Sequence, residues 1–368
     1  MDKNTYKLFD LENGVPTFAY ELDDAVAEGW LVPPRAVSVP LKFQREGIKY
    51  EDLSDEEQEE WEEKDWGEEG EVPDEIEASA VNKWLFNADT VDKVLQDLMT
   101  RGVKVDGGDR IAKTIIFAKN HQHAVFIQER FDKNYPHLKG SFARVIDNYE
   151  TYAQSILDDF STSDKVPHIA ISVDMLDTGV DVPEVANLVF FKIVRSKTKF
   201  WQMMGRGTRL CKNLFGPGKD KEFFSVFDYC QNLEFFGANA KGVEGSTQDS
   251  LSKKLFLRRL ELMQTVRAEK HAANGDPAAL KEPALAYGTL DHEIADRLHS
   301  EVTAMNVDNF LVRPKRRTIE QYADRKAWDV LEPQQAGEIA TELAGLPAEI
   351  DPEDITARQF DLLLLNLQ

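Results

Sequence analysis

The sequence predicts an α/β fold, in which a parallel β-sheet carries helices on both faces, followed by an all-α region. Between residues 88 and 235, short apolar runs alternate with amphipathic segments of helical period. That alternation is typical of βαβ units. After about residue 240 the strand pattern stops and only helical periodicity continues. We therefore assign residues 86–238 to an α/β domain and residues 239–368 to a helical domain.

The chain begins with a short region that we interpret as the tail of an upstream domain, residues 1–45. Residues 20–29 have the spacing of one short helix, which Pro33 and Pro34 would end. Residues 36–43 alternate like a strand, and Pro40 indicates an edge or a break there. This is too little sequence to form a domain alone.

An acidic linker follows at residues 46–85. Residues 51–77 hold sixteen Asp or Glu residues and one lysine, whereas the whole chain of 368 residues has a net charge of −22. Most of the negative charge is therefore local, and it does not exclude DNA binding elsewhere.

The elements of the two domains follow from periodicity. In the α/β domain we predict strands at 114–118, 143–146, 169–173, 188–191 and 223–227, and helices at 90–99, 121–131, 150–160 and 197–204. In the helical domain we predict helices at 250–272, 291–311, 318–330, 334–345 and 355–367.

Composition narrows the class of protein. No apolar run approaches the roughly 20 residues that a membrane span needs, and the N-terminus has no signal-peptide pattern. Cys211 and Cys230 lack the spacing of a zinc site or a disulfide framework. We expect a cytoplasmic protein with no membrane partner and no metal site.

The most informative stretch is residues 168–210, where two predicted strands end in charged or glycine-bearing turns. Open α/β sheets commonly bind ligands at the carboxyl edge, so we expect a site at that edge. Arg206 and Arg209 lie three residues apart and would share a helix face. Two guanidinium groups suit a polyphosphate. A surface helix whose arginines pair with local carboxylates would give the same pattern.

The turn at residues 174–181 contributes two further candidates. Gly179 could adopt a positive φ and let a ligand approach the backbone. Asp181 could accept a hydrogen bond from a ribose hydroxyl or hold an arginine. An ordinary strand-to-loop turn could have the same composition.

Together these segments resemble motifs IV, V and VI of superfamily 2 helicases. The matching residues are TIIFA at 114–118, the strand and GxD turn at 169–181, and QxxGRxxR at 202–209. The fold implied is a RecA-like second motor domain. Two segments also resemble the R (restriction) subunit of type I restriction enzymes, in the branch with a helical C-terminal domain. Their sequences are SVDMLDTGVDVPEVANLVFFK and RSKTKFWQMMGRGTRL.

The resemblance implies an ATP-dependent translocase of double-stranded DNA within a restriction endonuclease. ATP and Mg²⁺ would be its cofactors, with ATP between two RecA-like domains. Arg206 and Arg209 would be catalytic, and the supporting ATP-binding positions would be Gln202, Gly205, Gly179 and Asp181. Its partners would be DNA and the methyltransferase and specificity subunits. Val173 and Thr178 depart from the usual motif V, so no DNA contact is carried over from it.

Several expected motifs do not occur in the sequence. There is no GxxxxGK[ST] loop, no DExx after a strand pattern and no ordered PD…ExK nuclease set. We therefore expect a C-terminal fragment whose first motor domain and nuclease domain lie upstream. Alone it would be inactive and would bind ATP at most weakly.

Other residues allow two interpretations each. Asp228 could help position the site or cap local structure, and Trp201 and Phe200 could stack on adenine or pack on the sheet. His121 and His123 lie two apart, a spacing that disfavours a metal pair on a helix. Basic residues of the helical domain could bind DNA phosphates or a partner: Lys253, Lys254, Arg258, Arg313, Lys315, Arg316 and Arg317.

Two alternative functions share these features. The chain could belong to another superfamily 2 DNA translocase, used in repair or remodelling. It could instead be a non-catalytic assembly module that keeps a RecA-like fold.

Overall fold

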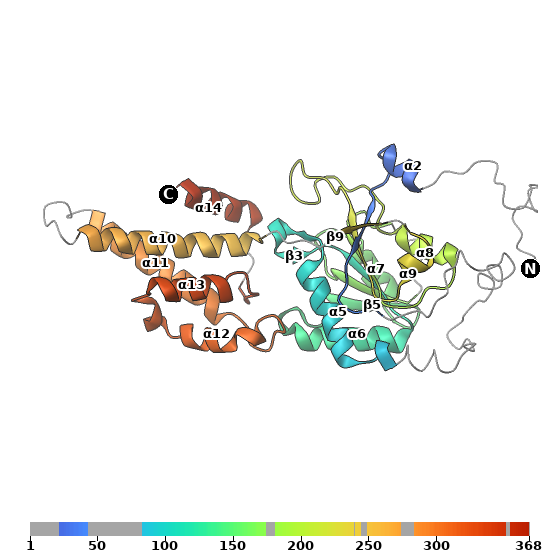
Figure 1. Ribbon diagram of the computed structural model, residues 1–368, viewed down its shortest axis with the longest axis horizontal. Coiled ribbons are helices and arrows are strands. Elements are labelled where there is room, and N and C mark those ends of the chain that lie inside the picture. Colours follow the sequence, from blue (N-terminus) through green and yellow to red (C-terminus); the bar gives the residue numbers. More distant parts are fainter. Residues whose placement is uncertain are drawn as a thin grey trace, which may run out of the picture.

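The computed structural model describes residues 22–42, 83–173, 181–238, 240–243, 249–273, 283–350 and 354–367. The acidic run at 51–77 and Gly179 lie outside these residues. An α/β part and a helical part are joined side by side, and the long helix α10 (Leu251–Ala273) runs away from the sheet (Figure 1).

The centre of the α/β part is a seven-stranded sheet with the order β5-β6-β4-β7-β8-β1-β9, in which every pairing is parallel. The strands are β1 (Pro34–Val37), β4 (Thr114–Phe117), β5 (Ala143–Ile146), β6 (Ile169–Ser172), β7 (Asn187–Phe190), β8 (Phe224–Asp228) and β9 (Lys241–Val243). A small antiparallel pair, β2 (Lys104–Val105) and β3 (Arg110–Ile111), flanks the sheet. The predicted RecA-like parallel sheet is confirmed.

Two strands of the sheet come from segments that the sequence analysis had placed outside the α/β domain. β1 comes from the segment interpreted as an upstream tail, yet it pairs with β8 on one side and β9 on the other. Its first residue is Pro34, a position at which a strand tolerates the missing N–H. β9 lies beyond residue 240, so the prediction that strands stop there is wrong. Three residues are too few to produce a period-2 signal.

Helices cover both faces of the sheet. The helices of this part are α2 (Leu22–Ala27), α5 (Ala88–Arg101), α6 (His121–Asn134), α7 (Ala153–Phe160), α8 (Lys197–Met204) and α9 (Asn232–Phe235). Buried side chains of α5 and α6, such as Leu95 and Phe131, pack on one face, and those of α7, α8 and α9, such as Phe160 and Phe200, pack on the other. Burying a side chain of this size contributes about 1.5–3 kcal/mol.

Side-chain caps begin three of these helices. Asn87 accepts from the backbone N–H of Thr90 in α5, and Asn120 accepts from that of His123 in α6. Ser196 accepts from the N–H of Lys199 at the start of α8. Such caps contribute about 1 kcal/mol each, because they satisfy N–H groups that the helix leaves unpaired.

The helical part has its own core. It contains α10, α11 (Pro283–Thr303), α12 (Arg316–Tyr322), α13 (Pro333–Glu342), α14 (Ile355–Leu367) and the 3-10 turns η4 (Arg313–Lys315) and η5 (Arg325–Trp328). Trp328 and Tyr322 are fully buried among apolar side chains of α10, α11 and α13. The predicted helical domain is therefore present, with the element predicted at 318–330 divided into α12 and η5.

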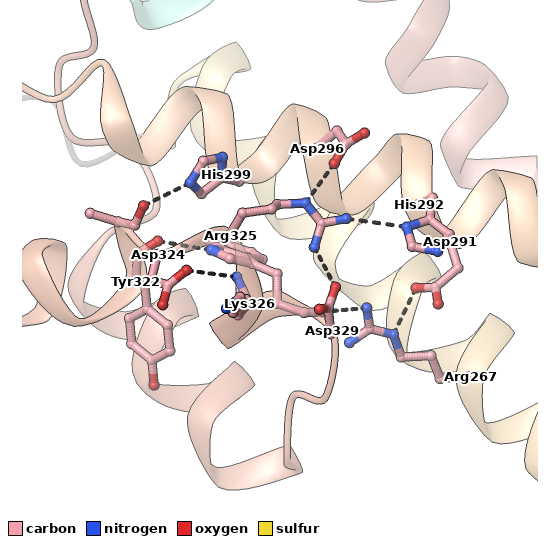
Figure 2. A network of polar contacts seen from close by, with 12 residues as sticks. Arg267, Asp291, His292, Asp296, His299, Tyr322, Asp324, Arg325, Lys326 and Asp329 are labelled. Carbon is pink, nitrogen blue, oxygen red and sulfur yellow. Dashed lines mark hydrogen bonds and ion pairs between the residues drawn. The ribbon is translucent and has the colours of Figure 1, made fainter.

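A polar network fastens η5 to α11 (Figure 2). Arg325 donates to Asp296 at 2.5 Å and to Asp329 at 2.8 Å, and its third nitrogen lies 3.3 Å from His292. Arg267 of α10 pairs with Asp291 at 2.7 Å and also donates to the carbonyl of Trp328. These arginines therefore hold the helical part together.

The two parts meet at two junctions. At the first, Asp109 accepts from the N–H of Ser252 at 3.1 Å and pairs with Arg358 of α14 at 2.8 Å. At the second, the N–H of Phe310 donates to the carbonyl of Asn134 at 2.8 Å. Asp109 places a carboxylate at the start of α10, where the helix dipole favours negative charge. Across the ranges given above, no helix has the length and apolarity to span a bilayer.

Candidate functional site

The two candidate arginines follow α8 in a short segment, residues 205–209, which we call the arginine loop. The apolar face of α8 packs into the core through Phe200, Met203 and Met204. Its other face leaves Gln202 exposed, whereas Arg206 is half-buried and Arg209 exposed. The fold therefore brings Gln202, Arg206 and Arg209 to one end of a helix whose position the core fixes.

Close backbone packing holds the arginine loop. A Cβ atom on Gly207 would lie 2.2 Å from Cδ2 of Phe224, so only glycine fits against this ring. The carbonyl of Thr208 accepts from the N–H of Val32 at 2.8 Å, and its hydroxyl donates to the carbonyl of Gly205 at 3.0 Å. The loop is thus attached to the first residue of β8 and to the segment that leads into β1.

Asp181 lies beside the arginine loop. Its Oδ1 is 3.0 Å from Nε of Arg209, and the two side chains are 64% and 54% exposed. Of the two roles considered for Asp181, the structure shows the one in which it holds an arginine. Among the described residues nothing pairs with the two terminal nitrogens of Arg209, so they are available to an anion. An exposed pair of this kind contributes about 0–1 kcal/mol.

Beneath this pair lies a lysine that the sequence analysis did not identify. Lys221 is 2% exposed. Its Nζ donates to the carbonyls of Pro183 at 3.0 Å, Val185 at 2.6 Å and Gly207 at 2.7 Å. Burial lowers the pKa of Lys221 to about 7, and the three carbonyl oxygens oppose this shift by stabilising the ammonium form. The sequence KDKEFF around it gives no sign of this role.

These residues share one edge of the sheet, and it is the amino-terminal edge. Asp181 precedes β7, Lys221 precedes β8, and the loop contacts the first residue of β8 and the approach to β1. The candidate arginines and Asp181 therefore lie at the amino-terminal edge and not at the carboxyl edge, where the sequence analysis expected them. The reason is topological: in a parallel sheet the chain must return from the carboxyl end of β6 to the start of β7 before Asn187, and α8 makes the same return before Arg206.

Asp228 lies at the opposite, carboxyl edge and has a capping role. Its carboxylate is buried and accepts from the N–H groups of Cys230 at 3.1 Å and Leu233 at 2.7 Å and from Asn232 Nδ2 at 2.9 Å. Burial raises the pKa of Asp228, against the effect of these donors. Asp228 therefore caps the turn before α9 and does not contact the arginine loop.

The carboxyl edge also gathers basic side chains. They follow the ends of β4 and β7 and begin α8: Lys119, Lys192, Arg195, Lys197 and Lys199. The pKa of Lys119 is lowered by burial and by the charge of Arg195. Positive charges are thus close enough at this edge to affect one another.

The aromatic and histidine candidates have local partners. The ring of Phe200 is buried and stacks on Phe236 at 4.7 Å, whereas Trp201 is 36% exposed. His121 Nδ1 lies 2.6 Å from Asp147 Oδ2. His123 is buried and accepts from the N–H of Lys119 at 3.2 Å. Phe200 is therefore a packing residue, and the two histidines have separate environments.

Most of the candidate basic residues of the helical part have internal acceptors. Lys253 pairs with Asp249, Arg258 with Glu261, Lys315 with Glu342, and Arg316 with Glu320. Arg313 donates to the carbonyl of Asp308 at 2.8 Å. Phosphate binding at these positions would have to compete with carboxylates already in place.

Comparisons with known proteins indicate what the chain is similar to. Residues 92–211 match the family described as the helicase conserved C-terminal domain. The endonuclease subunit of the type I restriction enzyme EcoKI, from Escherichia coli (strain K12), is 36% identical over 124 residues, which is 32% of this chain. The EcoAI endonuclease subunit, from Escherichia coli, is 25% identical over 237 residues, or 61% of this chain.

A solved fragment of a proposed HsdR subunit of a type I restriction enzyme, from Vibrio vulnificus YJ016, is 24% identical with a TM-score of 0.43. That match covers 66% of this chain and 41% of the other. The matched regions span 10% of the EcoKI subunit and 26% of the EcoAI subunit. The predicted relationship is confirmed: the chain carries a helicase C-terminal domain and is similar to type I restriction endonuclease subunits.

Proposed function

Because this chain carries a helicase C-terminal domain similar to that of type I restriction endonuclease subunits, we propose that it supplies the second motor domain of an ATP-dependent translocase of double-stranded DNA. In this role the arginine loop forms one side of an ATP site whose phosphate-binding loop lies on another domain. The observation that carries the proposal is the position of Arg206 and Arg209 at the amino-terminal edge, with the side chain of Arg209 54% exposed.

The chemistry of these residues suits phosphoryl transfer. A guanidinium group stays charged and can donate two parallel N–H bonds to phosphate oxygens. Arg206 is half-buried and Arg209 exposed, so Arg206 would bind a phosphate close to the protein surface and Arg209 one further out. Charge that develops on the transferred phosphoryl group would be stabilised by both, an effect worth about 10³–10⁵ in rate for arginines in this role.

ATP and Mg²⁺ would be held mainly by the other motor domain, because this sequence contains no GxxxxGK[ST] loop. Asp181 would keep the guanidinium of Arg209 in place until the nucleotide arrives. Gln202 would lie at the same end of α8, where its amide can donate to a phosphate or orient water. On this view the chain alone does not hydrolyse ATP.

The carboxyl edge is the better candidate for DNA. Lys197 and Lys199 are exposed in the first turn of α8, and Lys119, Lys192 and Arg195 belong to neighbouring segments of the same edge. A row of cations at helix starts and strand ends suits a phosphate backbone. ATP and DNA would then lie at opposite edges of one rigid sheet.

The helical part suits assembly with the methyltransferase and specificity subunits. Several of its arginines form internal pairs, such as Arg267–Asp291 between α10 and α11, which favours a structural arm over a DNA-binding surface. The support is the arrangement of charges together with the similarity to type I subunits.

The proposal is tested by ATP hydrolysis in the intact motor polypeptide. Arg209→Ala should lower kcat by about 10³-fold with little change in ATP affinity, because the guanidinium that it removes stabilises the transition state. The matched control is Arg258→Ala, which removes another exposed arginine paired with a carboxylate and should leave kcat unchanged. Equal kcat for wild type and Arg209→Ala would favour the assembly-module alternative.

A further inference from the structure

A buried lysine connects the two segments that carry the candidate ATP-site residues. We propose that Lys221 is a positioning residue, which fixes the arginine loop relative to Asp181 and so sets where the two guanidinium groups meet the nucleotide. The inference rests on the proposed function, since it concerns the geometry of the same site. It assigns a role to a side chain that lies outside the recognised motifs.

The geometry around Nζ uses the full capacity of a lysine. An ammonium group has three N–H donors, and Nζ of Lys221 has three carbonyl acceptors, those of Pro183, Val185 and Gly207, at 2.6 to 3.0 Å. The side chain is 2% exposed, so water does not compete for these bonds. Hydrogen bonds from a charged group are stronger than those between neutral groups.

The three acceptors belong to two separate segments. Pro183 and Val185 follow Asp181 by two and four residues, and Gly207 lies between Arg206 and Arg209. The side chains of these two segments also meet in the exposed pair Arg209–Asp181, which is too weak to hold the segments together. The buried lysine therefore accounts for the 3.0 Å approach of Arg209 to Asp181.

The second buried lysine of the α/β part provides a matched comparison. Lys113 is 3% exposed, and its Nζ donates to the carbonyls of Lys165 at 2.6 Å and Pro167 at 2.9 Å. Both acceptors precede β6, so Nζ of Lys113 joins the approaches to β4 and β6. Lys113 also lies near the segment after Asp181, because its carbonyl accepts from the N–H of Ala186 at 3.0 Å, but its ammonium group donates to other carbonyls. Replacing either lysine removes a buried ammonium group that is bound to carbonyls. Only the ammonium of Lys221 is bonded to the segments that carry Asp181 and Arg209.

The experiment compares Lys221→Met and Lys113→Met in the intact motor polypeptide, with ATP as the probe. Both variants should lower the midpoint of thermal unfolding. Lys221→Met should also lower kcat by at least about tenfold with KM for ATP changed less than about threefold, because a displaced arginine stabilises the transition state less well. Lys113→Met should keep kcat within about twofold of wild type.

A double variant separates positioning from general damage. If Lys221 acts through the arginine loop, then Lys221→Met should lower kcat by a smaller factor in the Arg209→Ala background than in wild type, because one of the two guanidinium groups that it positions is already absent. If kcat of the double variant falls by the product of the two single-variant factors, the inference is overturned. Lys221→Gln keeps two N–H donors and should give an intermediate kcat, and it replaces the methionine variant if that variant does not fold.

The kcat values of these variants distinguish failure of this inference from failure of the proposed function. If Arg209→Ala leaves kcat unchanged, the proposed ATP site is wrong. If Arg209→Ala lowers kcat but Lys221→Met or Lys221→Gln behaves like Lys113→Met, the site stands and the positioning role of Lys221 is overturned.

Discussion

At the scale of single residues, Asp181 and Arg209 show how little energy is needed to direct a side chain. Their ion pair is exposed on both sides, so its contribution to folding is small, and in the proposed site its role would be to favour one orientation of the Arg209 guanidinium. Asp181→Asn should therefore change the free energy of unfolding by less than about 0.5 kcal/mol, as measured by urea denaturation. The same variant should lower the ATPase kcat of the intact polypeptide.

A loss of more than about 1 kcal/mol in Asp181→Asn would mean that the pair has a structural role. Unchanged kcat would mean that Asp181 does not orient Arg209. The two measurements together therefore test whether the pair that Asp181 forms with Arg209 orients the guanidinium for catalysis.

His123 is the residue whose burial predicts a dependence of stability on pH. It lies between the rings of Phe86 and Phe191, at centroid distances of 5.2 and 4.9 Å, and burial lowers its pKa from 6.5 to about 3. Between those two values the unfolded chain takes up a proton that the folded chain does not. Stability should therefore fall as the pH falls below 6.5, by up to about 1.4 kcal/mol per pH unit for this group.

His168 should add a loss of the same sign, because burial and the charges of Arg110 and Lys113 lower its pKa to about 3. His123→Gln keeps a hydrogen-bond acceptor for the N–H of Lys119 but does not titrate. Urea unfolding at about pH 6.5 and about pH 5, where most carboxylates stay ionised, should show a smaller loss in the variant. Equal losses in both proteins would mean that His123 is protonated in the folded state.

At the scale of elements, the arginine loop depends on the close packing of Gly207 against Phe224. Gly207→Ala would place a methyl group 2.2 Å from the ring. The loop or the ring must then shift, which should cost about 1–3 kcal/mol and lower kcat by moving both arginines. Gly337→Ala is the matched control, since it lies within α13 with nothing within 4 Å of the added Cβ.

Gly337→Ala should stabilise the protein by about 0.5–1 kcal/mol, because alanine loses less backbone entropy in a helix than glycine. Thermal unfolding measures both changes. If Gly207→Ala unfolds at the wild-type temperature and keeps its kcat, the packing against Phe224 does not hold the loop.

The elements also show what the sequence could predict. The strands at 114–117 and 143–146 and the helices α8 and α13 lie within a few residues of their predicted positions, because their apolar periods match the faces that they bury. The arginines are recognisable from spacing and resemblance alone. The edge of the sheet at which they lie cannot be predicted in this way. The spacing of residues does not say at which edge a segment between two strands, such as 181–186, lies.

Lys221 and Gly207 escape prediction for a related reason. A lysine among charged residues is typical of a solvated side chain, and its burial depends on carbonyls brought together from Pro183, Val185 and Gly207. The short strand β9 pairs with β1, which lies far away in the sequence. Such long-range pairings leave no local periodic signal.

At the scale of the whole molecule, the proposed function would place ATP and DNA at opposite edges of the sheet. If DNA lies at the carboxyl edge, Lys197→Ala with Lys199→Ala should weaken DNA binding and reduce the slope of log K against log salt by about 0.9 for each phosphate that is no longer neutralised. Lys254→Ala, on the exposed face of α10, tests the other basic surface in the same titration. A reduced slope for Lys254→Ala alone would move the DNA site to the helical part.

The junctions decide whether the helical part follows the motor domain. Asp109 bonds both to the start of α10 and to Arg358 of α14, and Phe310 bonds to Asn134 at the end of α6. Two separated points of attachment resist rotation in a way that one does not. Movement at the ATP site would therefore be carried into the helical part as a rigid-body displacement.

The central claim is that the nucleotide meets the amino-terminal edge of this sheet through Arg206 and Arg209. Its most direct test is a cryo-electron microscopy structure of the intact motor polypeptide with ADP and aluminium fluoride, which imitates the transferred phosphoryl group. We predict that the guanidinium of Arg209 lies within about 3 Å of the fluoride ligands, the length of a charge-assisted hydrogen bond, with Lys221 still bound to its three carbonyls. A nucleotide found at the carboxyl edge beside Asp228, or one that neither arginine touches, would contradict the account.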